Sequence, residues 1–168
     1  TACAARAIPL ETVLTDLNAS ADRPEPEAMD WNRASLTELA DHVERTHHAY
    51  LRTELPRLTA LIEKVTLAHG DRHPWLADLQ GRFAAFRDAL EQHMHKEERV
   101  LFPLCRRMER GGASLFAPGG TIAHPIQVMM AEHDDAGEDM AAFRRLTGDY
   151  TLPEGACNTF RAMLDALA

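Results

Sequence analysis

The sequence predicts an all-α fold, an antiparallel four-helix bundle with a short helical appendage at its N-terminus. Three observations support this prediction. Apolar residues recur three and four positions apart over long stretches, segments rich in glycine and proline separate these stretches, and no stretch alternates apolar with polar residues as a half-buried strand would. The last stretch reaches Ala168 while still short, so the fourth helix is expected to be truncated.

The chain divides into three parts by composition. Residues 1–19 carry apolar side chains at helical spacing, which predicts the short appendage. Residues 20–30 contain two prolines among alternating charges and predict a linker with almost nothing to bury. Residues 31–168 hold the long apolar stretches, so they are expected to form the bundle.

The first two predicted helices are long. Ser35 is the expected N-cap of the first, whose apolar positions recur to about residue 65, with a kink at Pro56. The second helix follows a Gly- and Pro-containing turn and has an apolar stripe over 76–108, with Pro103 expected to bend or end it. Both helices are therefore expected to run the length of the bundle.

The third predicted helix begins with Pro125 in its first turn and closes near Gly148. The fourth is expected to start near Pro153. The inner face predicted for the third helix comprises Ile126, Met129, Met130, His133, Gly137 and Met140.

Composition excludes several functional classes. With 18 basic and 26 acidic residues the formal net charge is −8, which argues against a nucleic-acid partner. No apolar run is long enough to cross a membrane, and the three scattered cysteines form no Cys-x-x-Cys pair, so a disulfide framework or a thiolate zinc site is not expected. We expect a cytoplasmic protein. The unusual feature is the presence of nine histidines.

His93 and Glu97 are four residues apart within the apolar stripe of the second helix, so their side chains face the same way. A buried carboxylate without a partner is costly, so Glu97 must be neutralised by a proton, a cation or a metal. A metal would also account for the histidine. The alternative, a hydrogen-bonded core histidine beside a surface glutamate, stays open on this motif alone.

Two further helices offer candidate metal ligands. His133 belongs to the predicted inner face of the third helix, whereas the acidic residues around it are interpreted as a solvated face. The first helix offers His47 and His48. The apolar spacing favours His47, which falls nearer the middle of the stripe, and at this point the choice stays open.

The remaining histidines are interpreted as surface residues or residues at helix ends. His69 lies 21 residues beyond His48, roughly 31 Å along a helix at about 1.5 Å per residue, so it is excluded from the same site. The others are His42, His73, His95 and His124.

Five stretches together resemble a known family: 41–48, 51–58, 93–103, 132–138 and 153–157. They are similar to the hemerythrin-like di-iron proteins of the repair-of-iron-centres group, also called the YtfE/ScdA type. The resemblance covers nearly all of the chain from Trp31 onward. Its most specific part is the stretch 93–103 followed by the stretch 132–138.

The resemblance implies that His48 rather than His47 is the first-helix ligand, so that the metal ligands are His48, His93, Glu97 and His133. It implies two non-haem iron ions, with Glu97 as the candidate bridging carboxylate. It further implies a cytoplasmic role in nitrosative and oxidative stress defence, in which damaged iron–sulfur proteins are repaired and nitric oxide or dioxygen is the small ligand. A homodimer is left open.

The chain departs from the family pattern at both ends. His48 precedes His93 by 45 residues, and a second His-x-x-x-Glu pair at a like distance from His133 would fall past Ala168. The family's paired cysteines would precede Thr1. We therefore expect a shortened chain, with residues 1–19 the remnant of an N-terminal helical domain.

Two other functions are kept as alternatives. One is a hemerythrin-like module that binds or senses oxygen or nitric oxide without repairing anything. The other is a metal-free helical bundle such as a histidine phosphotransfer domain, which needs one exposed histidine. Metal analysis of the purified protein separates the metal-free bundle from the two functions that require a metal.

Overall fold

The computed structural model describes Glu11 and residues 30–111, 116–117 and 120–168. It divides the chain into two units, Thr1–Ala34 and Ser35–Ala168, and the second is described here by itself. The predicted appendage, 1–19, and most of the predicted linker, 20–30, lie outside the described residues, apart from the helical Glu11. The division into three parts therefore stays a prediction.

The first helical path is continuous through three segments: α3 (Leu36–His42), the π-helical η1 (Val43–His48) and α4 (Ala49–His69). Ser35 caps its start as predicted, because its hydroxyl accepts a hydrogen bond from the Glu38 N–H at 3.1 Å and the Glu38 carboxylate accepts one from the Ser35 N–H at 2.8 Å. Pro56 lies inside α4, so it does not end the path.

The second path descends through α5 (Trp75–Lys96), the π-helical η2 (Glu97–Leu101) and α6 (Phe102–Glu109). Pro103 falls in the first turn of α6 and does not end the path either. A two-residue antiparallel ladder follows, formed by β1 (Phe116–Ala117) and β2 (Gly120–Thr121), where the sequence predicted only a loop.

The last two helices are α7 (Ala123–Leu146) and α8 (Asn158–Leu167). Gly148 follows α7 with a positive φ of 58°, a conformation that suits glycine at a helix end. The fourth helix starts later than predicted, because Gly155 adopts a φ of 74° and the chain becomes helical only after Cys157.

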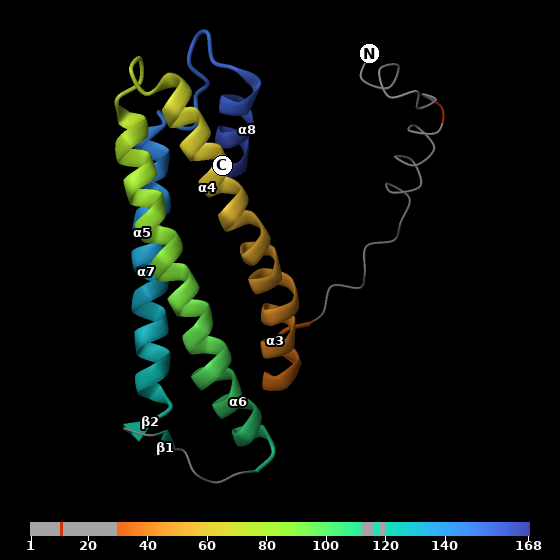
Figure 1. The fold of residues 1–168 in the computed structure, drawn as a ribbon. Helices are drawn as coiled ribbons and strands as arrows, with labels where there is room; N and C mark the ends of the chain where they lie inside the picture. Colours follow the sequence, from red (N-terminus) through yellow and green to blue (C-terminus); the bar gives the residue numbers. More distant parts are fainter. Residues whose placement is uncertain (1–10, 12–29, 112–115, 118–119) are drawn as a thin grey trace. The chain divides into compact units, whose positions relative to one another are not determined.

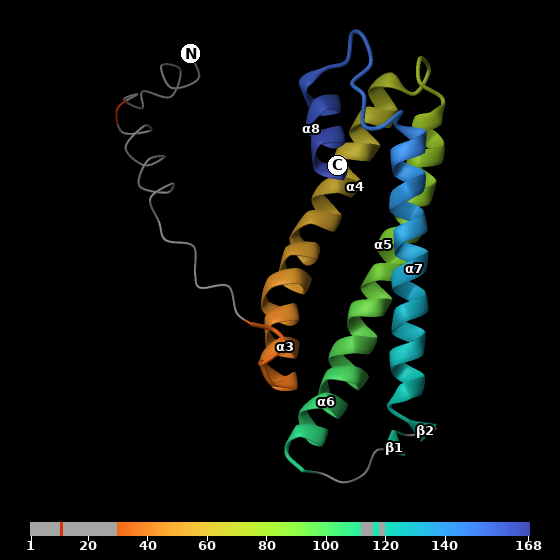
Figure 2. The same cartoon turned by 180° about the vertical axis from the view of Figure 1, so that it is seen from behind.

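Figures 1 and 2 show the helices running alternately up and down. The α4 helix packs against α5 and α8, α5 packs against α7, and α3 packs against α6 (Figure 1). The predicted all-α bundle with a shorter fourth helix is confirmed. None of the helices among the described residues is long and apolar enough to span a membrane.

The hydrophobic core is formed by side chains of α4, α5, α7 and α8, and it extends along α5 to Met94. Its six largest fully buried side chains are Ile62, Val65, Leu76, Leu79, Phe160 and Met163. The metal-ligand candidates lie further along the helices, toward α3 and α6, where buried apolar side chains such as Phe102 and Met129 accompany the buried polar ones.

The inner face predicted for α7 is only partly correct. Met129 is buried, but Met130 and Met140 are 61% and 56% exposed, and space beside Gly137 is open. The reason is that α8 packs mainly against α4, so within the described part of the chain no helix covers this face of α7. The periodicity marked an apolar face correctly but did not show what would cover it.

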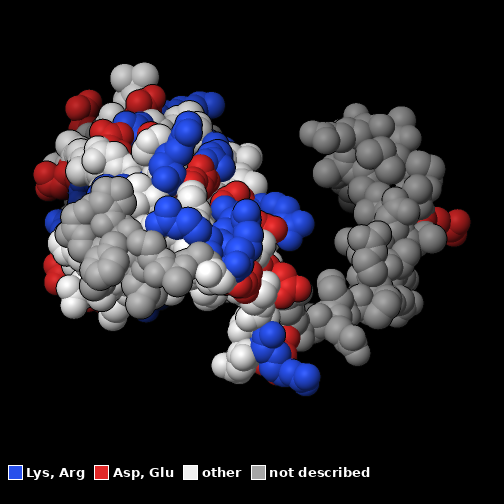
Figure 3. All heavy atoms as spheres, turned by 90° about the horizontal axis from the view of Figure 1, so that it is seen from below, with Lys and Arg blue, Asp and Glu red and all other residues white. Residues whose placement is uncertain are grey.

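Charged residues of both signs mix at the end of the bundle that carries α3 and α6 (Figure 3). Here Arg106 donates hydrogen bonds to Asp41 at 2.6 Å and to Glu44 at 2.9 Å, which ties α6 to α3 and η1. Basic side chains on this end are therefore interspersed with acidic ones rather than forming the uniformly basic surface that a nucleic acid requires.

A pair of leucines tests where the core lies. Leu79 is fully buried between the helices, whereas Leu67 on α4 is 90% exposed. We expect Leu79→Ala to lower the free energy of unfolding by about 2–5 kcal/mol, because it leaves a cavity. Leu67→Ala should change it by less than about 0.5 kcal/mol. Urea unfolding followed by circular dichroism measures both, and equal effects would contradict this packing.

Candidate metal centre

The four predicted ligands come from three helical paths. His48 is the last residue of η1, His93 lies near the end of α5, Glu97 opens η2, and His133 lies in the middle of α7. The first three are buried, with exposed fractions of 3%, 5% and 9%, whereas His133 is exposed. The candidate site is thus closed on the side of α4 and open on the side of α7.

One carboxylate joins two of the imidazoles. The Oε2 atom of Glu97 lies 2.9 Å from Nε2 of His48, and its Oε1 atom lies 3.5 Å from Nε2 of His93. Since the two oxygens face different rings, the charge of Glu97 is shared between the first and second helical paths.

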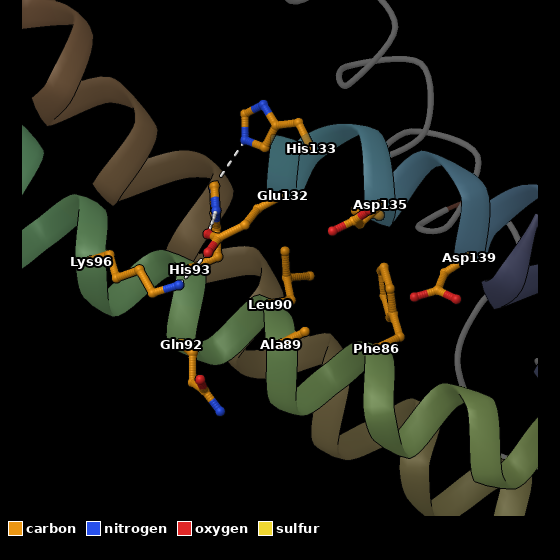
Figure 4. A pocket seen from close by; sticks show the side chains of 11 residues that line it. Phe86, Ala89, Leu90, Gln92, His93, Lys96, Glu132, His133, Asp135 and Asp139 are labelled. Atoms are coloured by element: carbon orange, nitrogen blue, oxygen red, sulfur yellow. Dashed lines mark hydrogen bonds and ion pairs between the residues drawn. The ribbon is translucent and has the colours of Figure 1, made fainter. Parts of the chain in front are cut away.

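His133 completes the cluster from α7. Its Nε2 atom lies 2.9 Å from Nε2 of His93, and Figure 4 shows the two rings meeting across the space between α5 and α7. Ligand atoms of His93, Glu97 and His133 all lie within 4.8 Å of one another. Two imidazole nitrogens at such a distance repel each other unless a proton or a cation lies between them, so this donor set fits a metal cation.

Two further carboxylates hold the buried rings from outside. Nδ1 of His48 lies 2.8 Å from Oε1 of Glu98, and Nδ1 of His93 lies 2.9 Å from Oε2 of Glu132. Because a carboxylate only accepts, we assign the proton to Nδ1 in both rings. The Nε2 lone pairs are then directed at the centre, which is the arrangement of a carboxylate–histidine–metal triad.

Cations in turn hold these outer carboxylates. Arg52 donates hydrogen bonds to both oxygens of Glu98 at 2.6 and 2.8 Å, and Lys96 forms an ion pair with Glu132 (Figure 4). Burial raises the pKa of each carboxyl, but its imidazole and its cation outweigh burial, so the pKa values of Glu98 and Glu132 lie below the ordinary value. Both groups therefore stay ionised as acceptors.

Sequence reasoning missed these outer carboxylates. The acidic residues beside His133 were interpreted as a solvated face, yet Glu132 is only partly exposed and accepts from His93. A signal was available in the sequence, because Glu98 directly follows Glu97 and Glu132 directly precedes His133. Helix phase alone could not show that Glu98 would reach His48, or that Glu132 would reach His93, because each pair joins two different helices.

The central groups have coupled charges. Burial raises the pKa of Glu97, but hydrogen bonds and charge interactions with His93 and His48 outweigh burial and bring that pKa below its ordinary value. When protonated, His93 donates a hydrogen bond to the Glu97 carboxylate, which raises the pKa of His93 against the effect of burial, and Glu132 adds to the rise. An ionised carboxylate and basic imidazoles share the centre, where protons and a metal cation compete for the same lone pairs.

Both π-helical segments coincide with candidate ligands. The η1 segment ends at His48 and η2 begins at Glu97. A π-turn contains one more residue than an α-turn, so it shifts the phase of every residue that follows. Counting at the α-helical period from the start of the first helix therefore leads to His47, whereas the structure buries His48 and leaves His47 exposed.

The rest of the first helix shows the same phase shift. Leu36 and Leu39, on which the spacing argument relied, are 43% and 42% exposed, and the buried residue of α3 is Ala40. Beyond η1 the buried positions include Leu55 and Ile62, seven and fourteen residues after His48. His48 therefore shares the inner face of α4, at the α-helical spacing that holds beyond the π-turn.

A pocket of about 250 Å³ opens between α5 and α7 beside the centre. His93, His133, Lys96 and Glu132 line one end of it, and Phe86 lies at the other (Figure 4). A small molecule entering from solvent can thus approach the Nε2 atoms of the two histidines without any movement of the helices.

The remaining histidines do not join this cluster among the described residues. His69 ends α4, at the opposite end of that helix from His48, as the length argument predicts. His95 is exposed on the outer side of α5, and His124 lies in the first turn of α7.

Comparison with known proteins agrees with the resemblance seen in the sequence. Residues 39–168 match the family described as hemerythrin HHE cation binding domain. The iron–sulfur cluster repair protein YtfE of Yersinia pseudotuberculosis is 36% identical over 161 residues, covering 95% of this chain and 69% of the relative. The protein of the same name from Yersinia pestis is 35% identical over the same shares of both chains. The chain therefore belongs to the hemerythrin-like, cation-binding family that includes the YtfE proteins.

Proposed function

We propose that this chain binds iron through His48, His93, Glu97 and His133 and acts in the repair of iron–sulfur clusters. The observation that carries the proposal is the convergence of the ligand atoms of His93, Glu97 and His133 within 4.8 Å, between helices of the bundle. Imidazole and carboxylate donors suit iron, and the family is a cation-binding one.

The arrangement of Glu97 supports a pair of ions rather than a single ion. One of its oxygens faces His48, and the other faces His93, whose ring meets His133. A carboxylate with its two oxygens directed to separate imidazoles can serve two cations while its single negative charge offsets part of both. We therefore propose two non-haem irons, with Glu97 as the bridge.

An iron pair, when bound, supplies a change of redox state and an open position for a diatomic ligand such as nitric oxide or dioxygen. The protein's own residues perform the supporting tasks. Glu98 and Glu132 fix the rings of His48 and His93 through Nδ1, so that Nε2 stays directed at the centre. The pocket between α5 and α7 admits a small molecule from the exposed side of His133.

The repair role is supported by the names of the relatives, which are called iron–sulfur cluster repair proteins. Their similarity to this chain extends over 95% of its length. Damaged iron–sulfur proteins are accordingly the proposed targets. The role in stress defence follows from the same chemistry, because nitric oxide and oxidants both damage such clusters and bind to iron.

A reconstitution assay tests this function. The iron-loaded chain is added to a dehydratase whose [4Fe–4S] cluster has been damaged by nitric oxide, and recovered dehydratase activity is measured. We expect more recovery than from an equal amount of free iron. The Glu97→Gln chain, treated with iron in the same way, should give no more recovery than free iron.

The open pocket favours a second candidate function, the binding or sensing of a small gas. The same assay separates the two. If the iron-loaded chain changes its absorption spectrum on addition of nitric oxide but restores no dehydratase activity beyond that of free iron, the repair function is rejected and the binding function is retained.

A further inference from the structure

Far from the metal centre, packing of α8 on α4 joins a cysteine to a histidine. Cys157 is exposed and directly precedes α8, whereas His69 ends α4 and is only 7% exposed. Their side chains meet with His69 Nε2 3.3 Å from Cys157 Sγ, although 88 residues separate them in the chain.

The thiol is the hydrogen-bond partner of the buried ring. Among the described residues, Cys157 Sγ is the only hydrogen-bonding atom that meets the His69 imidazole. Phe160 lies against the same ring with centroids 5.3 Å apart. Aromatic packing therefore holds the imidazole toward the sulfur, which is how a base is positioned next to a nucleophile.

The start of α8 favours the thiolate as well. Hydrogen bonding from His69 is the largest cause that lowers the pKa of Cys157, to about 7, and the backbone N–H groups of Phe160 and Thr159 contribute in the same direction. The half-buried Cys105 behaves in the opposite way, because burial raises the pKa of its thiol. The two cysteines thus differ in both exposure and charge.

We propose that Cys157 and His69 form a reactive thiolate–imidazole pair that undergoes exchange with small disulfides. The Cys157 sulfur attacks one sulfur of a low-molecular-mass disulfide, the S–S bond of the reagent breaks, and a new S–S bond joins Cys157 to half of the reagent. The departing thiolate takes the electron pair of the broken bond and the proton that the Cys157 thiol had first given to His69. The products are a mixed disulfide on the protein and one free small thiol.

This site is separate from the proposed iron centre. His69 lies 21 residues beyond His48, so the two sites are roughly 31 Å apart along α4 at about 1.5 Å per residue. Iron loading should be the same in the Cys157→Ser chain as in the original. The proposal therefore does not depend on the proposed function.

The test uses a chain in which Cys3 and Cys105 are replaced by serine, so that Cys157 is the only thiol. Its second-order rate of reaction with 5,5′-dithiobis(2-nitrobenzoate) is measured from pH 5 to about pH 10. We expect the rate to rise with an inflection near pH 7. Incubation with glutathione disulfide should then add one glutathionyl group, seen by intact mass and lost in Cys157→Ser.

Two histidine variants show whether the pair acts as proposed. In His69→Gln the inflection should move to about pH 8.5, that of an ordinary thiol. At pH 6 the thiolate fraction then falls about thirtyfold, and because a more basic thiolate is the better nucleophile, the rate should fall by only about sixfold. His73→Gln is the matched control, since His73 contacts the rings of His69 and Phe160 but not the thiol.

Three results would overturn the proposal. They are an inflection at or above about pH 8.5 in the single-thiol chain, an unchanged inflection in His69→Gln, or an equal shift in His73→Gln. Circular dichroism and thermal melting check that the variants fold. Should His69→Gln fail to fold, the pH profile of the single-thiol chain decides by itself, because it needs no histidine variant.

Discussion

We expect Glu97→Gln to abolish iron loading while the helical bundle stays folded. The substitution keeps the size of the side chain but removes its charge, and it places an amide N–H₂ against an imidazole nitrogen that faces the centre. Loss of an outer carboxylate of a metal site already costs about 10- to 100-fold in affinity, so we expect more than about 100-fold for this residue. Iron content per chain after anaerobic loading and desalting measures the effect.

Matched variants make this result specific. Glu91→Gln removes an exposed carboxylate of α5, six residues before Glu97, and should leave the iron content unchanged. The histidine pair gives a second contrast: His48→Gln, at a buried ring, should lose iron, and His47→Gln, at an exposed one, should keep it. His69→Ala should also keep it. Iron loss from His47→Gln or His69→Ala comparable to that from Glu97→Gln would refute the proposed ligand set.

Iron binding should raise the thermal stability of the chain strongly. The proposed ligands come from three helical paths, so a bound cation joins η1, α5 with η2, and α7 and binds the folded state in preference to the unfolded one. At free iron about 1,000-fold above its Kd the gain is about 4 kcal/mol. For a chain of this size, that corresponds to a rise in Tm of roughly 8–16 °C.

Thermal melting of the same preparation before and after chelation measures this effect. The chelated chain should melt at the lower temperature and recover when ferrous iron is added back under anaerobic conditions. Glu97→Gln should show no comparable rise at the same iron concentration. A rise of equal size in Glu97→Gln would mean that iron stabilises the bundle from some other place.

The fold could be predicted because the signal is local. An apolar stripe at a spacing of three and four requires a helix, and three long helices with a short fourth can bury their stripes together only by packing as a bundle. The starts of helices were less predictable. Ser35 capped α3 as expected, whereas α8 began four residues beyond Glu154, since the backbone at Gly155 is incompatible with a helix.

The candidate site was predictable only in part. His93 and Glu97 lie on one helix at a spacing of four, so their common direction follows from helix geometry alone. The direction of His133 toward this cluster followed from the apolar face of its helix, but its exposure did not, because that face of α7 is open within the described part of the chain. The first-helix residue was identified by family resemblance, while spacing led to its neighbour.

The sequence by itself determined the all-α class, the approximate helices and the pairing of His93 with Glu97, because each depends on contacts within one helix. Helical spacing could not decide which of His47 and His48 is buried, since η1 shifts the helical phase, and the structure shows that it is His48. Tertiary structure alone decided that Glu98 and Glu132 orient the histidines of other helices, and that Cys157 meets His69. These contacts join residues 39 to 88 positions apart, and only the packing of whole helices sets such distances.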